Sequence, residues 1–252
     1  MSEQITVPPP PPSIAPASAD RAPVAAWWHT VVFILIFLGL GALQAFQQPK
    51  MQQLQFRSRM PLYASTIALD LILLAYVWLA GLLPARKRLR DLIGGKWATA
   101  GDFGRDVAIA AIFWVIVLVV LAGVAQLLGH NVTGPATVKA LLPQGAAEMV
   151  MWLVMCIAAG FVEEVLFRGY LQRQFFALTG NYAAAIVLQA LVFGSAHLYQ
   201  GAKNAIAITI YGALFGILAV KSKSLRPGMM QHAGQDSLAG IAGAILRNHK
   251  LI

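Results

Sequence analysis

Long apolar runs separated by short polar connections dominate this chain of 252 residues. Several runs reach the roughly 20 residues that an α-helix needs to cross the hydrocarbon core of a bilayer. Two later runs are shorter, and short apolar segments in membrane proteins often line cavities. We therefore predict an all-α, polytopic transmembrane bundle with about seven spans, within a range of six to eight. The predicted spans cover residues 27–46, 62–83, 107–128, 146–178, 182–196, 205–220 and 229–246.

The chain divides into three regions. Residues 1–24 include five consecutive prolines at positions 8–12, and such a segment cannot bury a core, so we expect a disordered tail. The tail lacks the basic region that directly precedes the apolar stretch of a secretory signal, so we expect no cleavage. Residues 25–145 supply N-terminal transmembrane helices of a generic kind. Residues 146–252 contain the polar motifs described below and form the predicted functional core.

Composition supports a membrane protein. The chain is 58% hydrophobic and 12% charged, with a mean hydropathy of +0.67, whereas soluble domains carry about 25% charged residues. The net charge of +9 arises from 19 basic and 10 acidic residues. The basic residues gather in connections between apolar runs, which favours orientation in a membrane over binding of nucleic acid. We predict a multi-pass protein of a bacterial inner membrane with a cytoplasmic N-terminus.

Glu163, Glu164 and Arg168 interrupt the fourth apolar run. A charged group in mid-bilayer costs roughly 2.5–3.5 kcal/mol on insertion scales, which indicates that the three groups have a function. Glu164 and Arg168 are four residues apart with the acid first, so they should form an ion pair on one helix face. Glu163 then lacks a cation and can act as a general base. The structural alternative is a buried ion pair that fixes helix packing, with Glu163 facing water at a helix end.

Two further polar motifs follow on other predicted helices. His197 ends an apolar segment, four residues after Phe193. His232 lies four residues before Asp236, on the same helix face, where the carboxylate can orient the imidazole. Each histidine alone is more often a core residue. Together with Glu163 they place ionisable groups on three separate helices, which favours a common site.

The chemistry that these groups predict is hydrolysis of an amide bond. Glu163 and His197 can hold the attacking water. His232 and Asp236 can stabilise the developing charge or orient the carbonyl. A zinc site is the alternative, with Glu163, His197 and His232 as the three protein ligands of an open catalytic centre. Residue identity does not separate the two routes, although the spacing differs from that of the zinc-binding H-E-x-x-H helix.

Other isolated polar residues are assigned structural positions. Asp70 interrupts the second span, and we expect it to face other helices, with a functional role as the alternative. His29 and His130 lie at span ends, where a solvated or interfacial histidine is typical. Cys156 cannot form an intrachain disulfide and is predicted to be a core residue. The last part of the fourth span is expected to emerge at the cytoplasmic interface; it contains Arg168, Gln172, Arg173 and Gln174.

The predicted topology conflicts with the motifs at one point. Seven spans place Glu163 and His232 towards the cytoplasm, whereas His197 ends a segment that begins on the cytoplasmic side at Tyr182. Fifteen helical residues rise roughly 22 Å, so His197 should lie near the opposite face. Either this helix begins outside the bilayer, or it is strongly tilted, or the number of spans is off by one.

Three motifs in a fixed order carry a family resemblance. They are Glu163-Glu164-x-x-x-Arg168, Phe193-x-x-x-His197 and His232-x-x-x-Asp236, accompanied by characteristic segments at residues 167–172 and 225–228. Their order and separation resemble the CPBP family of intramembrane glutamic proteases, formerly the Abi family, which includes the type II CAAX prenyl endopeptidases. The resemblance covers roughly residues 150–245. It implies a helical membrane endopeptidase that cleaves a membrane-anchored peptide or protein, including prenylated substrates of the CAAX type.

The resemblance also implies roles for these residues. Glu163 and His197 would activate a water, while His232 and its neighbour four residues on would complete the site near the oxyanion. Proteins of this family are described both with and without a metal; we expect a mechanism without a cofactor and keep zinc as the alternative. The candidate site residues are Glu163, Glu164, Arg168, His197, His232 and Asp236.

One departure from the family pattern limits the substrate assignment. Asp236 stands where the prenyl endopeptidases carry asparagine, and an ionised aspartate cannot donate a hydrogen bond to an oxyanion. This weakens the case for prenylated substrates. Because the family includes proteins of bacteriocin self-immunity, a non-proteolytic immunity or scaffolding protein of the same fold is the alternative function. A proton-coupled transporter is a third reading of the intramembrane charges. The sequence does not fix the oligomeric state.

Overall fold

The structure is a computed structural model that describes residues 22–53, 57–129 and 140–249. These residues form helices and no β-strand, which confirms the predicted all-α class. The elements are α1 (Trp27–Gln53), α2 (Met60–Tyr76), the π-helix η1 (Val77–Leu82), α3 (Leu89–Ile93), α4 (Ala100–Leu128), α6 (Ala146–Glu163), the π-helix η3 (Glu164–Leu171), α7 (Gln172–Thr179), α8 (Tyr182–Ser195), the 3₁₀-helix η4 (Leu198–Gln200), α9 (Ala202–Ser222) and α10 (Arg226–Asn248).

Five helical stretches of the described residues are long and apolar enough to cross a membrane. They are Trp27–Gln47, Met60–Leu82, Ala100–Leu128, Ala146–Thr179 and Ala202–Ser222. The predicted spans at residues 182–196 and 229–246 also form helices, but α8 is shorter than a crossing and α10 is not among the five. The polytopic bundle is therefore confirmed. Residues 1–21 of the predicted tail and His130 lie outside the described residues.

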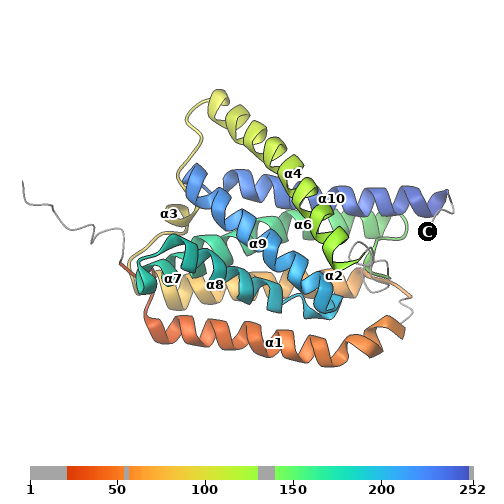
Figure 1. Cartoon of the computed structure of the whole chain (residues 1–252), viewed down its shortest axis with the longest axis horizontal. Helices are drawn as coiled ribbons and strands as arrows, with labels where there is room; N and C mark the ends of the chain where they lie inside the picture. Colours follow the sequence, from red (N-terminus) through yellow and green to blue (C-terminus); the bar gives the residue numbers. More distant parts are fainter. Residues whose placement is uncertain (1–21, 54–56, 130–139, 250–252) are drawn as a thin grey trace, which may run out of the picture.

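The helices pack so that the motif-bearing segments meet inside the bundle. Figure 1 shows α1 along the lower edge of the molecule and α4 crossing the upper side obliquely, with α10 reaching towards the C-terminus. α6 packs against both α2 and α10, and α8 packs against α7 and α9. The polar motifs lie on α6, η3, α10 and the end of α8, which this packing gathers in the interior.

A tight hairpin joins α7 to α8. Gly180 ends α7 with a φ of 64°, a left-handed conformation that glycine adopts without steric cost. Asn181 then caps α8, because its Oδ1 accepts hydrogen bonds from Ala183 N at 2.8 Å and Ala184 N at 3.3 Å. The two helices therefore run antiparallel from a sharply defined reversal.

This hairpin resolves the conflict in depth between Glu163 and His197. Glu163 lies sixteen residues before the end of α7, and His197 lies fifteen residues after the start of α8. At roughly 1.5 Å per residue, both lie about 22–24 Å from the reversal. The rings of Phe167 and Phe193, each one turn closer to the reversal, are 4.9 Å apart and confirm this pairing. The long fourth helix places Glu163 and His197 at similar distances from the reversal, which accounts for the apparent mismatch.

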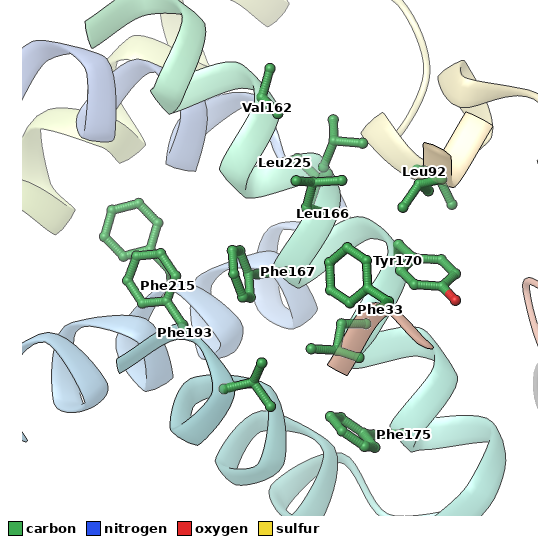
Figure 2. Packing of buried hydrophobic residues seen from close by; sticks show 14 of the residues in the cluster. Phe33, Leu92, Val162, Leu166, Phe167, Tyr170, Phe175, Phe193, Phe215 and Leu225 are labelled. Atoms are coloured by element: carbon green, nitrogen blue, oxygen red, sulfur yellow. The ribbon is translucent and has the colours of Figure 1, made fainter. Parts of the chain in front are cut away.

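Aromatic side chains from three elements form the centre of the core (Figure 2). Phe167 of η3 packs edge-on against Phe37 of α1 and Phe193 of α8, with ring centroids 4.9 Å apart in both pairs. Phe33 is 5.4 Å from Tyr170 in the same geometry, which aromatic quadrupoles favour. All eight residues of η3 are buried. Glu164 and Arg168 of the polar first motif are thus embedded in this aromatic core.

Most polar side chains in the last part of the fourth span, which is expected at the cytoplasmic interface, are buried inside the protein. Arg168, Gln172 and Gln174 are buried, and only Arg173 is exposed. The reason is that neighbouring backbone groups pair with the amides. Gln172 Nε2 donates to Gly216 O at 3.2 Å, and Gln174 Nε2 donates to a carbonyl of the segment before α1 at 2.9 Å. These hydrogen bonds offset the free-energy cost of burying the two amides in an apolar bundle.

The solvated position that is typical of a histidine at a span end is wrong for His29. His29 is fully buried, with Nδ1 2.7 Å from the Tyr170 hydroxyl and its ring stacked on Tyr76 at 4.2 Å. The Tyr170 hydroxyl also lies 2.8 Å from Thr30 Oγ1, which accepts from Gln174 Nε2 at 2.6 Å. This network ties the start of α1 to η3 and α7. The predicted burial of Cys156 is confirmed, since it is 1% exposed.

The outward faces of the spans are apolar. Val119 and Leu127 of α4 are 68% and 87% exposed, and comparable side chains project from α1, α2 and α6. Contiguous exposed apolar surface of this kind is unusual for a soluble monomer and suits contact with lipid.

Candidate active site

The first motif lies where an α-helix changes into a π-helix. Glu163 is the last residue of α6 and Glu164 the first of η3. π-helical segments are rare and occur frequently at functional sites. The two acids differ in their surroundings: Glu164 is 1% exposed and does not line the cavity, while Glu163 does.

Glu164 and Arg168 form the expected ion pair, with Arg168 Nη1 2.9 Å from Glu164 Oε1. Arg168 Nη2 also donates to Gly212 O at 3.2 Å. The guanidinium carbon lies 4.4 Å from the centre of the Phe193 ring and 5.1 Å from that of Phe215. Cation–π contact and hydrogen bonding together compensate a charge that would otherwise be expensive to bury.

His232 lies between carboxyl groups. Its Nδ1 is 3.1 Å from Glu164 Oε1, and since a carboxylate oxygen can accept two hydrogen bonds, the Nδ1–H is the donor. Its Nε2 is 3.7 Å from Glu163 Oε2 and 3.6 Å from Asp236 Oδ2. The expected pairing of His232 with Asp236 along one helix face is therefore present. The ring links the first motif on η3 to the third motif on α10.

His197 is held by its own helix end. Its Nδ1 is 2.9 Å from Phe193 O, and because a carbonyl only accepts, Nδ1 carries the hydrogen. In a neutral ring Nε2 then has a free lone pair. The rings of His197 and Phe193 are 4.8 Å apart, which fixes the imidazole plane further. His197 can thus accept a hydrogen bond from a water or present Nε2 to a metal.

A cavity of about 560 Å³ joins these groups. Side chains of α1, α2, α6, α9, α10 and the connection after α8 line it. Four of the predicted site residues reach it: Glu163, His197, His232 and Asp236. Glu164 and Arg168 do not line the cavity. The structure therefore divides the six predicted residues into four that face the cavity and an ion pair that supports His232 from behind.

The comparison with known families agrees with this geometry. Residues 144–238 match the family described as type II CAAX prenyl endopeptidase Rce1-like. This matched segment is called the Rce1-like domain below. No curated protein and no solved structure gives a significant match to the chain. The resemblance to the intramembrane protease family is confirmed, and the kind of function that it supports is that of a CAAX-type protease in a membrane.

The Rce1-like domain contains all six predicted site residues and runs from the end of the described connection before α6 into α10. Glycines allow its helices to approach closely. A Cβ on Gly160 of α6 would lie 2.7 Å from Ala233 N of α10, and one on Gly194 of α8 would collide with Thr209 Oγ1 of α9. Close approach of backbones at these points brings the motif residues within reach of one cavity.

Several cavity residues escaped the sequence analysis. Tyr199 and Tyr211 face the cavity, but single tyrosines in apolar helices give no signal that separates them from core residues. Trp152 Nε1 donates to the backbone O of Asp236 at 3.0 Å and so anchors the third motif to α6. Asp70 also lines the cavity, from α2, which lies outside the Rce1-like domain. The sequence did mark Asp70, because it is a single charged residue in an apolar run.

The ligand set of the zinc alternative does not assemble in the described residues. No group of three or more His, Cys, Asp and Glu side chains is placed there to hold a metal ion. Glu163 and His232 face each other at 3.7 Å, but the carboxyl of Asp236, rather than His197, is the next group near His232 Nε2. The residues of the Rce1-like domain therefore do not fit the zinc site that the sequence suggested.

Proposed function

We propose that this protein is an intramembrane endopeptidase that hydrolyses a peptide bond of a membrane-anchored substrate inside the 560 Å³ cavity. The observation that carries the proposal is the presence of Glu163, His197 and His232 on the walls of one cavity within an apolar bundle. A base, a hydrogen-bond acceptor for water and a donor for the oxyanion are the parts that amide hydrolysis needs.

Glu163 and His197 are the groups assigned to the attacking water. Glu163 Oε2 is buried without a hydrogen-bond partner, so it is available to take a proton. His197 Nε2 accepts the second hydrogen of the water, because its Nδ1 donates to Phe193 O. The water oxygen forms a bond to the scissile carbonyl carbon as Glu163 takes its proton. Collapse of the tetrahedral intermediate breaks the C–N bond, and the proton passes from Glu163 to the leaving amine.

His232 is assigned to the oxyanion. As an imidazolium it donates from Nδ1 to Glu164 and from Nε2 towards the cavity. Asp236 Oδ2, 3.6 Å from Nε2, orients the ring and is not required as a donor. The Glu164–Arg168 pair fixes the opposite side of the imidazole. This arrangement supplies one preorganised donor for the oxyanion.

The cavity lining suits a substrate with an apolar anchor. Alongside its ionisable groups the cavity presents apolar side chains from α1, α2 and α6, among them Phe37, Leu73 and Leu166. We assign a membrane-anchored peptide of the CAAX type as the substrate class, in keeping with the Rce1-like domain. The polar part of such a peptide would lie beside Glu163, and its anchor against the apolar wall.

The proposal is tested with detergent-purified protein and a library of quenched fluorescent peptides, some of them prenylated. Glu163→Gln and His197→Ala should each lower cleavage at least about 100-fold, since a positioned base or acceptor typically contributes 10²–10⁴-fold. Asp91→Asn, which alters an exposed carboxyl of α3, is the control and should cleave like the wild type.

Each outcome has a defined meaning. Full cleavage by folded Glu163→Gln protein would exclude Glu163 as the base. Cleavage that a chelator abolishes and zinc restores would replace the proposed water activation with a metal-dependent route. A folded wild type that cleaves no member of a broad library would move the assignment towards an immunity or scaffolding protein.

A further inference from the structure

Asp70 of α2 faces the cavity without a partner. It is 7% exposed, lines the cavity, and its Oδ2 is buried with no hydrogen-bond partner among the described residues. Burying a carboxylate without a cation or hydrogen-bond donor is costly, and proteins seldom retain such a group without a use for it. A ligand that enters the cavity would supply the partner that the described residues do not.

The register of α2 against α6 locates Asp70 along the cavity. Near the start of both helices, Arg59 N donates to Glu148 Oε1 at 2.8 Å. One turn later the rings of Tyr63 and Trp152 meet with centroids 5.5 Å apart. In both pairs the residue of α6 is 89 positions after the residue of α2. The two helices therefore run parallel, and this numerical difference gives their register.

Continuing this offset places Asp70 level with Ala159, which also lines the cavity. Glu163 is four residues further along α6, or roughly 6 Å along the helix axis. An extended peptide advances about 3.3 Å per residue, so this separation corresponds to about two residues of substrate. Asp70 is therefore placed to meet a side chain within about two residues of the bond that Glu163 would attack.

The charges of the cavity select the chemistry of that side chain. Three carboxyl groups line it, those of Asp70, Glu163 and Asp236, and its only basic lining residues in the described part of the chain are His197 and His232. Lysine and arginine are missing from that lining. Both histidines are already assigned to the reaction, so Asp70 is the carboxyl of the lining that is left to meet an entering cation.

We propose that Asp70 is a specificity residue that binds a lysine or arginine side chain of the substrate within about two residues of the scissile bond. This inference rests on the proposed endopeptidase function and adds the charge of the substrate to it. Asp70 accepts charge-assisted hydrogen bonds from the ammonium or guanidinium, and the apolar stem of that side chain lies along the cavity wall.

The test compares peptides that differ at one position. In a cleavable peptide, each of the two residues on either side of the scissile bond is replaced in turn by lysine, norleucine or glutamate. Wild-type protein should give kcat/KM at least about tenfold higher for lysine than for norleucine at one of these positions, and lower values for glutamate. Asp70→Asn should remove the preference for lysine while cleaving the norleucine peptide, and Asp70→Glu should restore part of it. Ser65→Ala, on the exposed side of α2, is the control for handling and folding.

A binding measurement separates this inference from the proposed function. Fluorescence polarisation with Glu163→Gln protein reports affinity even if the wild type cleaves none of the peptides. The lysine peptide should bind about tenfold more tightly than the norleucine peptide, and Asp70→Asn in the same background should equalise them. Equal affinities before that change, or a lysine preference that survives it, would overturn the role of Asp70.

Discussion

His232 and Glu164 meet across two helices, with Nδ1 3.1 Å from the same Oε1 that accepts from Arg168 at 2.9 Å. One carboxylate oxygen thus joins a cation on η3 to a histidine on α10. The imidazole is fixed from behind, which leaves Nε2 as the only ring nitrogen that can act in the cavity. The position of His232 therefore depends on a pair of residues that do not touch the cavity themselves.

Breaking this pair should cost more stability than replacing it. Arg168→Met leaves Glu164 buried without its cation, and loss of one partner of a buried pair costs about 3–5 kcal/mol. The double variant Glu164→Leu, Arg168→Met removes both charges and should recover much of that loss. Denaturant unfolding in detergent measures the difference. Both variants should lose cleavage, because His232 is no longer oriented; a single variant as stable as the wild type would contradict the buried pair.

Gly160 should tolerate no side chain. A Cβ there would lie 2.7 Å from Ala233 N, so Gly160→Ala pushes α10 away from α6 and displaces the neighbouring His232. A shift of about 1 Å in a catalytic group can cost 100-fold in rate, and overpacking typically costs about 1–3 kcal/mol. Gly234→Ala is the matched control on α10, because no heavy atom lies within 4 Å of its added Cβ. Equal activity of the two variants would show that the α6–α10 contact is looser than described.

The hydroxyl of Tyr170 should stabilise the attachment of α1. Tyr170→Phe leaves His29 Nδ1 and Thr30 Oγ1 without their common partner, and an unsatisfied buried polar group costs about 1–3 kcal/mol. Thermal unfolding in detergent, followed by the fluorescence of Trp27 and Trp28 at the start of α1, measures the effect. Tyr182→Phe, at a half-exposed ring, should change the unfolding temperature little. A variant Tyr170→Phe with wild-type stability would refute the network as an anchor.

Asp106 should matter more than Asp102, although both lie near the start of α4. Asp106 is 1% exposed and accepts from Arg226 Nε at 2.7 Å and Trp97 Nε1 at 2.8 Å. Asp106→Asn leaves Arg226 poorly compensated, for an expected loss of about 3–5 kcal/mol. Asp102 caps α4 through Thr99 in a solvated position, so Asp102→Asn should cost less. Chemical denaturation of the two variants in parallel decides the order, and a reversed order would contradict the buried bridge between α4 and α10.

The sequence was sufficient for features that depend on local spacing. The Glu164–Arg168 pair follows from a separation of four residues, and the pairing of His232 with Asp236 follows from the same rule. The long fourth helix and the cavity-facing positions of Glu163 and His197 also agree with the pattern. Glu163 and His197 lie at similar distances from the reversal between α7 and α8. The sequence marks this reversal by the Gly180-Asn181 pair.

Features that depend on distant partners could not be predicted. The burial of His29 and Gln174 could not be foreseen, because hydropathy counts their polarity and does not reveal the hydrogen bonds that compensate it. The π-helix at Glu164 has no sequence signature that separates it from an α-helix. Asp70 was visible as an isolated acid, but its alignment with α6, and hence its place in the cavity, depends on the packing of Tyr63 against Trp152.

The cavity draws its walls from two stretches of the chain, only one of which the family model matches. The acids and histidines assigned to bond cleavage belong to residues 144–238, whereas the facing wall, including Asp70, is contributed by α1 and α2. Changes in that wall would alter which peptides are accepted without disturbing the groups that cut them. A chimera could join the first two helices of one such protein to the catalytic segment of another. We expect it to show the substrate specificity of the first protein and the catalytic groups of the second.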